Sequence, residues 1–291
     1  MEHNITTSGD GSSTLQLTRF NETYHSRNGA YTEAQHIYIK NGLEHLFQTT
    51  SCGAGTLPDK SGTVSVGMCT GSARTDALGN RRSMHLNIFD VGFGTALNCI
   101  LAWAWQQTLA AAGLPHPSIT YYGIEKYPIP LTETEQLNYH TIIAQHSDLL
   151  PDKLQETFLL KHSCPWEEDV AIPGIICSGN GEFILHKSCA DIATLGAEYY
   201  REACSNKEKE SRCSTDTATA VVFYDTFSPA TQPELWNEAI FRNIAAGCPA
   251  GSVLVTYCSK GTVKQALRAA GFTLERLAGP PGKRHILRGT L

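Results

Sequence analysis

Two glycines and one acid stand where the character of the sequence changes, in the stretch NIFDVGFGTALN. An apolar run ends at Asp90, Gly92 and Gly94 follow, and an apolar pattern with helical spacing begins after them. A glycine turn at the carboxyl end of a strand allows backbone N–H groups to approach a nucleotide. Glycines also serve purely steric needs in tight turns, so this motif alone leaves both interpretations open.

Two further acids follow later segments that have the composition of strands. Glu125 comes just after SITYYGI, where a carboxylate can accept hydrogen bonds from both hydroxyls of a ribose. Asp191 lies beyond GEFILHKS, where it can accept a hydrogen bond from the amino group of adenine. Each is also compatible with a surface acid at the start of a loop. Their recurrence at the ends of successive strands favours an adenosine-binding edge.

The spacing of the glycines distinguishes between two cofactors. A dinucleotide fingerprint has a third glycine, and Leu97 occupies that position. Asp90 disfavours a nearby pyrophosphate but suits the cationic amino group of S-adenosyl-L-methionine (SAM). We therefore predict SAM as the cofactor.

The segments that must position these residues alternate between strand and helix. The patterns predict strands over 83–92, 118–128, 181–195, 217–229 and 251–259, and helices over 94–113, 131–146 and 233–247. Thr132 and Glu135 have the spacing of a capping box at the start of the second helix. A short strand is predicted over 35–42, and loops are predicted over 51–62 and 205–214.

Two last strands, 273–279 and 284–289, are joined by a connection too short for a parallel crossover, so they form an antiparallel hairpin. The pattern predicts an α/β fold whose mostly parallel sheet ends in this hairpin. A chain of 291 residues allows one such domain with elaborations.

Composition narrows the classes of protein further. No apolar run approaches the ~18 residues that a membrane span needs, and the polar start MEHNITTSGD has no secretory signal pattern, so we expect a cytoplasmic protein. The ten cysteines include no CxxC pair, which predicts free thiols and no metal site. The oligomeric state stays open.

Charge is unevenly distributed along the chain. The formal net charge is −5, whereas residues 251–291 contain seven Lys or Arg and one acid. This basic segment is either an electrostatic footprint for a polyanion or a solvated charged face.

At this point five segments together resemble one family. They are YHSRNGAYTEAQHIYI, FDVGFGTALN, YYGIEKYP, FYDTFSPATQPELW and GFTLERLAGPPGKRHILRG. In this order they resemble, from about residue 20 to residue 289, the methyltransferase domain that modifies the aminomethyl group of the tRNA wobble uridine. This domain is called MnmC when fused to a second domain and MnmD when free-standing.

The resemblance implies a Rossmann-like class I SAM-dependent methyltransferase fold with an N-terminal β extension. We accordingly expect a flexible leader at 1–18, an N-terminal β/loop extension and cofactor flap at 19–80, and the methyltransferase domain at 81–291. The implied reaction methylates 5-aminomethyl-(2-thio)uridine in the anticodon stem-loop of tRNA to the methylaminomethyl base. Because the sequence stops after the final strand, it resembles the free-standing form, and no flavin is expected.

The resemblance also implies roles for single residues. Asp225 would be the catalytic partner of the amine, and Phe227 would stack on the uracil, although a turn-ordering acid and a core aromatic are compatible with the same positions. Lys283 and Arg284 would contact anticodon-loop phosphates. The predicted SAM-binding residues are Tyr24, Ser26 and Glu33 in the flap, with Asp90, Gly92, Gly94, Thr95, Asn98, Glu125, Lys126 and Asp191 in the domain.

One departure from the family pattern concerns the glycine turn. Ala96 occupies a position where the family usually has glycine, so its methyl group is expected to crowd the methionine part of SAM. Three other functions are compatible with parts of the pattern: methylation of a small amine, a nucleotide-linked oxidoreductase, and a binding protein without activity.

Overall fold

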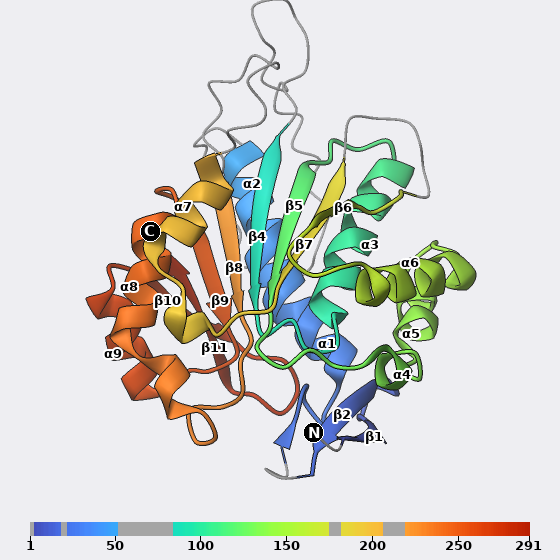
Figure 1. The fold of residues 1–291 in the computed structure, drawn as a ribbon, viewed down its shortest axis with the longest axis horizontal. Helices are drawn as coiled ribbons and strands as arrows, with labels where there is room; N and C mark the ends of the chain where they lie inside the picture. The colour runs from blue at the N-terminus through green and yellow to red at the C-terminus, as the bar shows by residue number, and fades with distance from the viewer. Residues whose placement is uncertain (1–2, 19–21, 52–83, 175–181, 206–218) are drawn as a thin grey trace, which may run out of the picture.

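The computed structural model describes residues 3–18, 22–51, 84–174, 182–205 and 219–291. The predicted loops at 51–62 and 205–214 lie outside these ranges except for their first residues. An eight-stranded sheet forms the centre, in the order β10-β11-β9-β8-β4-β5-β7-β6 (Figure 1). Its strands are β4 (His85–Val91), β5 (Ser118–Ile124), β6 (Asp169–Ala171), β7 (Phe183–Ser188), β8 (Thr219–Tyr224), β9 (Val253–Thr256), β10 (Thr273–Ala278) and β11 (His285–Thr290).

The sheet confirms the predicted α/β class. Strands β7, β5, β4, β8 and β9 are parallel, and the C-terminal hairpin β10–β11 is antiparallel, with β11 paired to β9. The sequence did not predict β6, an antiparallel edge strand on β7. Because the strand order reverses between β4 and β8, the connections after these two strands diverge and leave room for a ligand at their carboxyl ends.

Helices cover both faces of the sheet, so the central strands are buried on both sides. In β4, Ile88 belongs to a core under the N-terminal helices and α3, whereas the next residue, Phe89, belongs to a core under α7 and α8. None of the helices in the described ranges is long and apolar enough to cross a bilayer. The longer helices are α3 (Leu97–Ala111), α6 (Pro151–Ser163), α7 (Ala197–Ser205), α8 (Glu238–Gly247) and α9 (Gly261–Ala269).

The predicted strand at 35–42 is wrong, because this segment is helical. It lies in the π-helix η1 (Gln35–Glu44), between α1 (Ala30–Ala34) and α2 (His45–Ser51). The buried run Ile37, Tyr38 and Ile39 packs in the core on one face of the sheet. A short apolar run of this kind has no period that separates a strand from a buried helix.

The predicted helix at 131–146 is interrupted. It forms α4 (Leu131–Thr134) and α5 (Tyr139–Gln145), and the residue that precedes the first of them is Pro130, so Thr132 caps nothing. At the break, the Asn138 side chain accepts a hydrogen bond from Ser13 N at 2.7 Å and donates to Gly11 O at 2.9 Å. A contact with the N-terminal segment therefore competes with continued helix.

That N-terminal segment is ordered, so the expectation of a flexible leader at 1–18 is wrong for the part that is described. Strands β1 (His3–Thr7) and β2 (Ser13–Leu17) form an antiparallel hairpin, to which β3 (Glu22–Thr23) adds. Leu15 is fully buried in the main core. In Figure 1 the hairpin lies at the end of the sheet where β4 and β5 end.

The turn of this hairpin caps helix α1. Its first three N–H groups, which have no partner within the helix, donate to Ser8 Oγ at 3.1 Å, Ser12 Oγ at 3.1 Å and Asp10 Oδ2 at 2.8 Å. Burial would raise the pKa of Asp10, but hydrogen bonds from Ser12 and Thr32 outweigh it and lower this pKa to about 2. The ionised form of Asp10 therefore stabilises the contact between hairpin and helix.

The turn before α3 contains a strained residue. Ala96 has φ 58° and ψ 20°, in the left-handed region that costs a residue with a side chain about 1 kcal/mol. Its methyl group is fully buried in the main core. Alanine at this position therefore adds a backbone cost that glycine would not have.

We expect Asp10→Ala to lower the free energy of unfolding by about 1 kcal/mol, as the loss of a helix cap does. The exposed acid Asp148 is the matched control, and Asp148→Ala should change stability little. Because Asp10 has a lowered pKa in the fold, its stabilisation is complete above the unfolded value near 4 and is lost as the pH falls towards 2. Urea unfolding at pH 7 and pH 3 measures both effects. Equal destabilisation by the two variants at pH 7 would contradict the capping role.

We expect Ala96→Gly to leave the free energy of unfolding nearly unchanged. Release of the left-handed strain gains about 1 kcal/mol and loss of the buried methyl costs about 0.8 kcal/mol. In contrast, Ala110→Gly within α3 should cost about 1 kcal/mol, because glycine is unfavourable in a helix. Thermal unfolding of the two variants makes the comparison, and an equal loss would mean that Ala96 is unstrained.

Candidate functional site

Four acidic residues stand at the carboxyl ends of four neighbouring strands. Asp90 is the last but one residue of β4, Glu125 directly follows β5, and Asp225 directly follows β8. Asp191 lies after β7. The sheet thus brings together, at one edge, acids that are far apart in the sequence.

An amide connects two of these acids at the point where the strand order reverses. Asn98 Nδ2 lies 3.0 Å from Asp225 Oδ2 and 3.4 Å from Asp90 Oδ1, and Tyr121 donates to Asp90 Oδ2 at 2.6 Å. Burial raises the pKa of Asp90 well above its usual range, which favours the neutral acid. Burial also raises the pKa of Asp225, to about 7, although the hydrogen bond from Asn98 counteracts it.

Two positions in the turn between these acids cannot carry a side chain. Gly92 has φ +94°, and a Cβ there would lie 2.5 Å from Asp225 O. Gly94 has φ +46°, and a Cβ there would lie 3.0 Å from the Tyr24 ring. These two positions need glycine for conformation and for space, because the Asp225 carbonyl and the Tyr24 ring occupy the places that side chains would take.

Glu125 presents carboxylate oxygens beside this turn, and Asp191 follows the neighbouring strand β7. Glu125 accepts hydrogen bonds from Gly94 N at 3.1 Å and from Tyr127 N at 2.9 Å, and burial nevertheless raises its pKa. Asp191 caps a short 3-10 helix through Ala193 N at 2.9 Å. Lys126 pairs with Asp191 at 2.7 Å, and its hydrogen bond lowers the pKa of that carboxyl.

Thr95 is held by residues that the sequence did not single out. Its hydroxyl lies 2.7 Å from His25 Nε2 and 3.0 Å from Tyr139 Oη, and its carbonyl lies 3.1 Å from His162 Nε2. Burial lowers the pKa of His25 and of His162 to about 4, so both are neutral at pH 7. His25 adjoins the predicted Tyr24, but no periodic pattern marks either histidine.

The segment that follows the N-terminal hairpin covers the glycine turn. Tyr24 packs on Gly94 and meets the Phe227 ring edge-on, with 5.1 Å between ring centres. Its hydroxyl lies 3.3 Å from His3 Nε2, and His3 in turn pairs with Glu133 of α4. The other predicted flap residue, Ser26, bonds only within its own turn in the described contacts.

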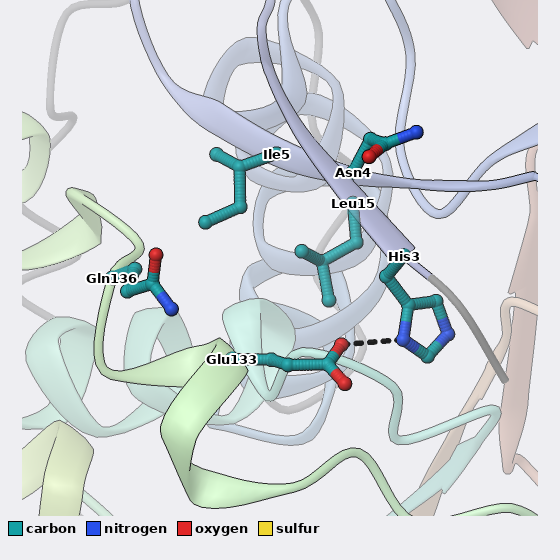
Figure 2. Close-up of a pocket in the computed structure, with 6 residues that line it drawn as sticks. All are labelled: His3, Asn4, Ile5, Leu15, Glu133 and Gln136. Atoms are coloured by element: carbon teal, nitrogen blue, oxygen red, sulfur yellow. Dashed lines mark hydrogen bonds and ion pairs between the residues drawn. The ribbon is translucent and has the colours of Figure 1, made fainter.

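A cavity of about 250 Å³ lies between this hairpin and α4 (Figure 2). The pair of His3 and Glu133 closes one side of it. Its lining consists of His3, Asn4, Ile5, Leu15, Glu133 and Gln136.

Three hydrogen bonds fix the loop that carries Asp225 and Phe227. Tyr257 donates to Thr226 O at 3.0 Å, Trp236 donates to Phe227 O at 2.9 Å, and Glu22 of β3 accepts from Ser228 N at 3.1 Å. The loop is thus tied to both the sheet and β3.

Of the remaining predicted residues, two form an ion pair and one is an exposed cation. Glu33, predicted in the SAM flap, forms an ion pair with Lys283, which was predicted to face phosphates. Arg284 is exposed. The sequence did not predict the contact between Glu33 and Lys283.

This edge fits SAM by the chemistry of its groups. Carboxylate oxygens of Glu125 and Asp191 can accept hydrogen bonds from hydroxyl and amino groups. The buried Asn98 Oδ1 has no hydrogen-bond partner among the described residues, so it offers an acceptor for a ligand donor. Among the described residues, no cluster of His, Cys, Asp and Glu is arranged to hold a metal ion.

Comparison with known proteins agrees with this fit. Residues 204–291 match the family described as S-adenosyl-L-methionine-dependent methyltransferase. The chain is 26% identical over 277 residues, 93% of its length, to the tRNA 5-methylaminomethyl-2-thiouridine biosynthesis bifunctional protein MnmC of Methylobacillus flagellatus. It is 26% identical over 290 residues, 96% of its length, to the protein of the same name from Cupriavidus metallidurans. In both cases the match spans 32% of the relative.

The fold agrees with a solved structure of the same group. The crystal structure of MNMC2 from Aquifex aeolicus aligns with a TM-score of 0.58 and 19% sequence identity, covering 100% of this chain and 70% of the other. This likeness supports the fold. The chain is similar to the MnmC proteins over about a third of their length, it shares the fold of MNMC2, and its residues 204–291 match the S-adenosyl-L-methionine-dependent methyltransferase family.

Proposed function

We propose that this protein transfers a methyl group from SAM to the primary amine of 5-aminomethyluridine, thiolated or not, at the wobble position of tRNA in the cytoplasm. One observation carries the proposal: Asn98 holds the Asp225 carboxylate at 3.0 Å, and the buried Oδ1 of the same amide has no hydrogen-bond partner among the described residues. The names of the MnmC relatives, which refer to synthesis of 5-methylaminomethyl-2-thiouridine in tRNA, support the choice of substrate.

The cofactor would be held by the edge of the sheet. SAM supplies a methyl group on a sulfonium, which an amine can attack in line. Glu125 would accept from the ribose hydroxyls, Asp191 from the adenine amino group, and the region of Asp90, Thr95 and Asn98 would receive the methionine part. The Tyr24 ring, which already covers Gly94, would exclude water from this region.

Asp225 would handle the proton of the substrate amine. An alkylammonium like that of lysine has a pKa near 10 and must lose a proton before its lone pair can attack. The pKa of Asp225 is raised to about 7, so near neutral pH this carboxylate is a stronger base than an ordinary Asp. It can accept the hydrogen bond that orients the amine, and Phe227, close behind it in sequence, offers a ring for the extruded uracil.

The partner would be the anticodon stem-loop. The exposed cations of the C-terminal region can contact its phosphates, which bind Lys and Arg without regard to sequence. They are Lys260, Arg268, Arg276 and Arg284. Activity on a small amine would leave these side chains without a role.

We expect Asp225→Asn to lower methyl transfer at least a hundredfold while SAM binding is largely retained, since the amide cannot accept the proton. The test measures transfer of labelled methyl from SAM to tRNA from cells that lack this modification, with nucleoside analysis of the product. The exposed Asp148 again gives the control, Asp148→Asn. If aminomethyluridine is present and the wild-type protein transfers no label, tRNA is not the substrate. Normal turnover by Asp225→Asn would show that Asp225 is not the proton acceptor for the amine.

The raised pKa of Asp225 also predicts two pH dependences. Methyl transfer should fall as the pH drops below about 7, because the protonated acid cannot accept a proton. For stability the sign is opposite. The fold favours the protonated acid, so this group destabilises the fold progressively as pH rises from about 4 to about 7. Thermal unfolding should therefore show that Asp225→Asn gains more stability at pH 8 than at pH 5. An equal effect at both pH values would contradict the raised pKa.

A further inference from the structure

An ion pair between a segment near the start of the chain and one near its end is linked, through Tyr257, to the loop that carries Asp225. The Glu33 carboxylate on α1 contacts Lys283 Nζ in the turn between β10 and β11. The same ammonium lies 4.9 Å from the centre of the Tyr257 ring, and Tyr257 donates to the carbonyl of Thr226, the residue after Asp225. The Glu33 side chain is 10% exposed and the Lys283 side chain is 25% exposed, so the pair is largely shielded from water.

Both partners are held by rigid backbone. Lys283 N donates to Pro280 O at 2.9 Å across a turn in which Gly282 has φ +86°, the geometry of a type II turn with Pro281 and Gly282 at its centre. This turn packs on the loop before α1, where a Cβ at Gly282 would overlap the Asn28 amide. The order of α1 itself depends on its cap from the hairpin, described above. Little rearrangement is therefore open to the pair.

We propose that Glu33 and Lys283 are positioning residues for methyl transfer. They influence the charge at Asp225 and do not themselves contact the reacting amine. Glu33 adds negative charge and Lys283 adds positive charge near the same carboxyl, so their balance adjusts the ionisation that burial chiefly sets. The predicted effect on catalysis rests on the proposed function. The electrostatic part concerns Asp225 alone.

Other titratable groups also face Asp225. They are Asp90 on β4, Tyr121 on β5, Tyr38 on η1, Tyr139 on α5 and Tyr257 after β9. Burial raises the pKa of each of these five groups, which favours the neutral form in every case. Glu33 and Lys283 are the opposed charges that act on Asp225, the first raising its pKa and the second lowering it.

Removal of either charge has a definite sign. Glu33→Gln removes a repulsive negative charge, so the pKa of Asp225 should fall by about one pH unit. Lys283→Met removes an attractive positive charge and should raise this pKa by a similar amount, about one pH unit. The double variant removes both and should return the pKa close to the wild-type value. A merely structural role predicts instead that the double variant is the most disturbed.

The experiment follows Asp225 directly, by NMR of the carboxyl carbon in protein labelled at aspartate, titrated over pH. The Asp225 signal is the one missing in Asp225→Asn. The pH dependence of methyl transfer to tRNA is measured on the same variants and should shift in the same directions. Lys283→Arg keeps the charge and should keep the wild-type titration.

A remote ion pair provides the matched control. Lys153 and Glu156 on α6 are exposed and lie 2.7 Å apart, so Lys153→Met and Glu156→Gln should leave the titration of Asp225 unchanged. Shifts of Asp225 in the same direction in Glu33→Gln and Lys283→Met, or no shift in either, would overturn the inference. If the titrations shift as expected but the wild-type protein transfers no methyl to tRNA, the proposed function fails and the electrostatic role stands.

Discussion

Repulsion among carboxyl groups at one edge of a single sheet is the constraint on which the site depends. Parallel strands bring the residues at their carboxyl ends together, and here those residues include Asp90, Glu125, Asp191 and Asp225. Water screens such charges poorly where they are buried. The fold must therefore neutralise or pair each of these acids in its own way.

The solutions differ from acid to acid, and the differences separate their chemistry. Burial favours the neutral form of Asp90, which also accepts a hydrogen bond from the Tyr121 hydroxyl. In contrast, the surface cation Lys126 keeps Asp191 ionised. Glu125 accepts two backbone N–H groups. Asp225 lies between these extremes, with a pKa near neutrality, because burial is partly balanced by neighbouring hydrogen bonds and charges. Similar residues at equivalent places thus acquire different proton affinities.

The N-terminal hairpin links the stability of the protein to this site. Its turn caps α1 through Asp10, and α1 carries Glu33 towards Lys283. Beyond the hairpin, Tyr24 packs on the glycine turn and Glu22 bonds the loop after β8. A change in the hairpin should therefore affect both the cover over the cofactor region and the charge near Asp225. The edge of the sheet and its cover form one connected structure.

Local sequence determined much of the scaffold. Continuous apolar runs such as the one ending at Asp90 predict strands buried on both faces, and the short link before Lys283 permits only a hairpin. The fold class and the positions of the four acids after their strands follow from these local patterns. Strand residues and the acids that follow them are neighbours in sequence, so no long-range information is needed.

The tertiary structure decided the rest, since it depends on contacts between distant segments. Residues 35–42 are helical because the hairpin caps α1 and the sheet buries the apolar run, and neither partner is adjacent in sequence. The break before α5 reflects the bond between Asn138 and Ser13. Likewise the pair of Glu33 and Lys283, and with it the charge around Asp225, exists only once the first and last segments of the chain meet. Propensity and periodicity describe a residue's neighbours along the chain, whereas burial and charge depend on its neighbours in space.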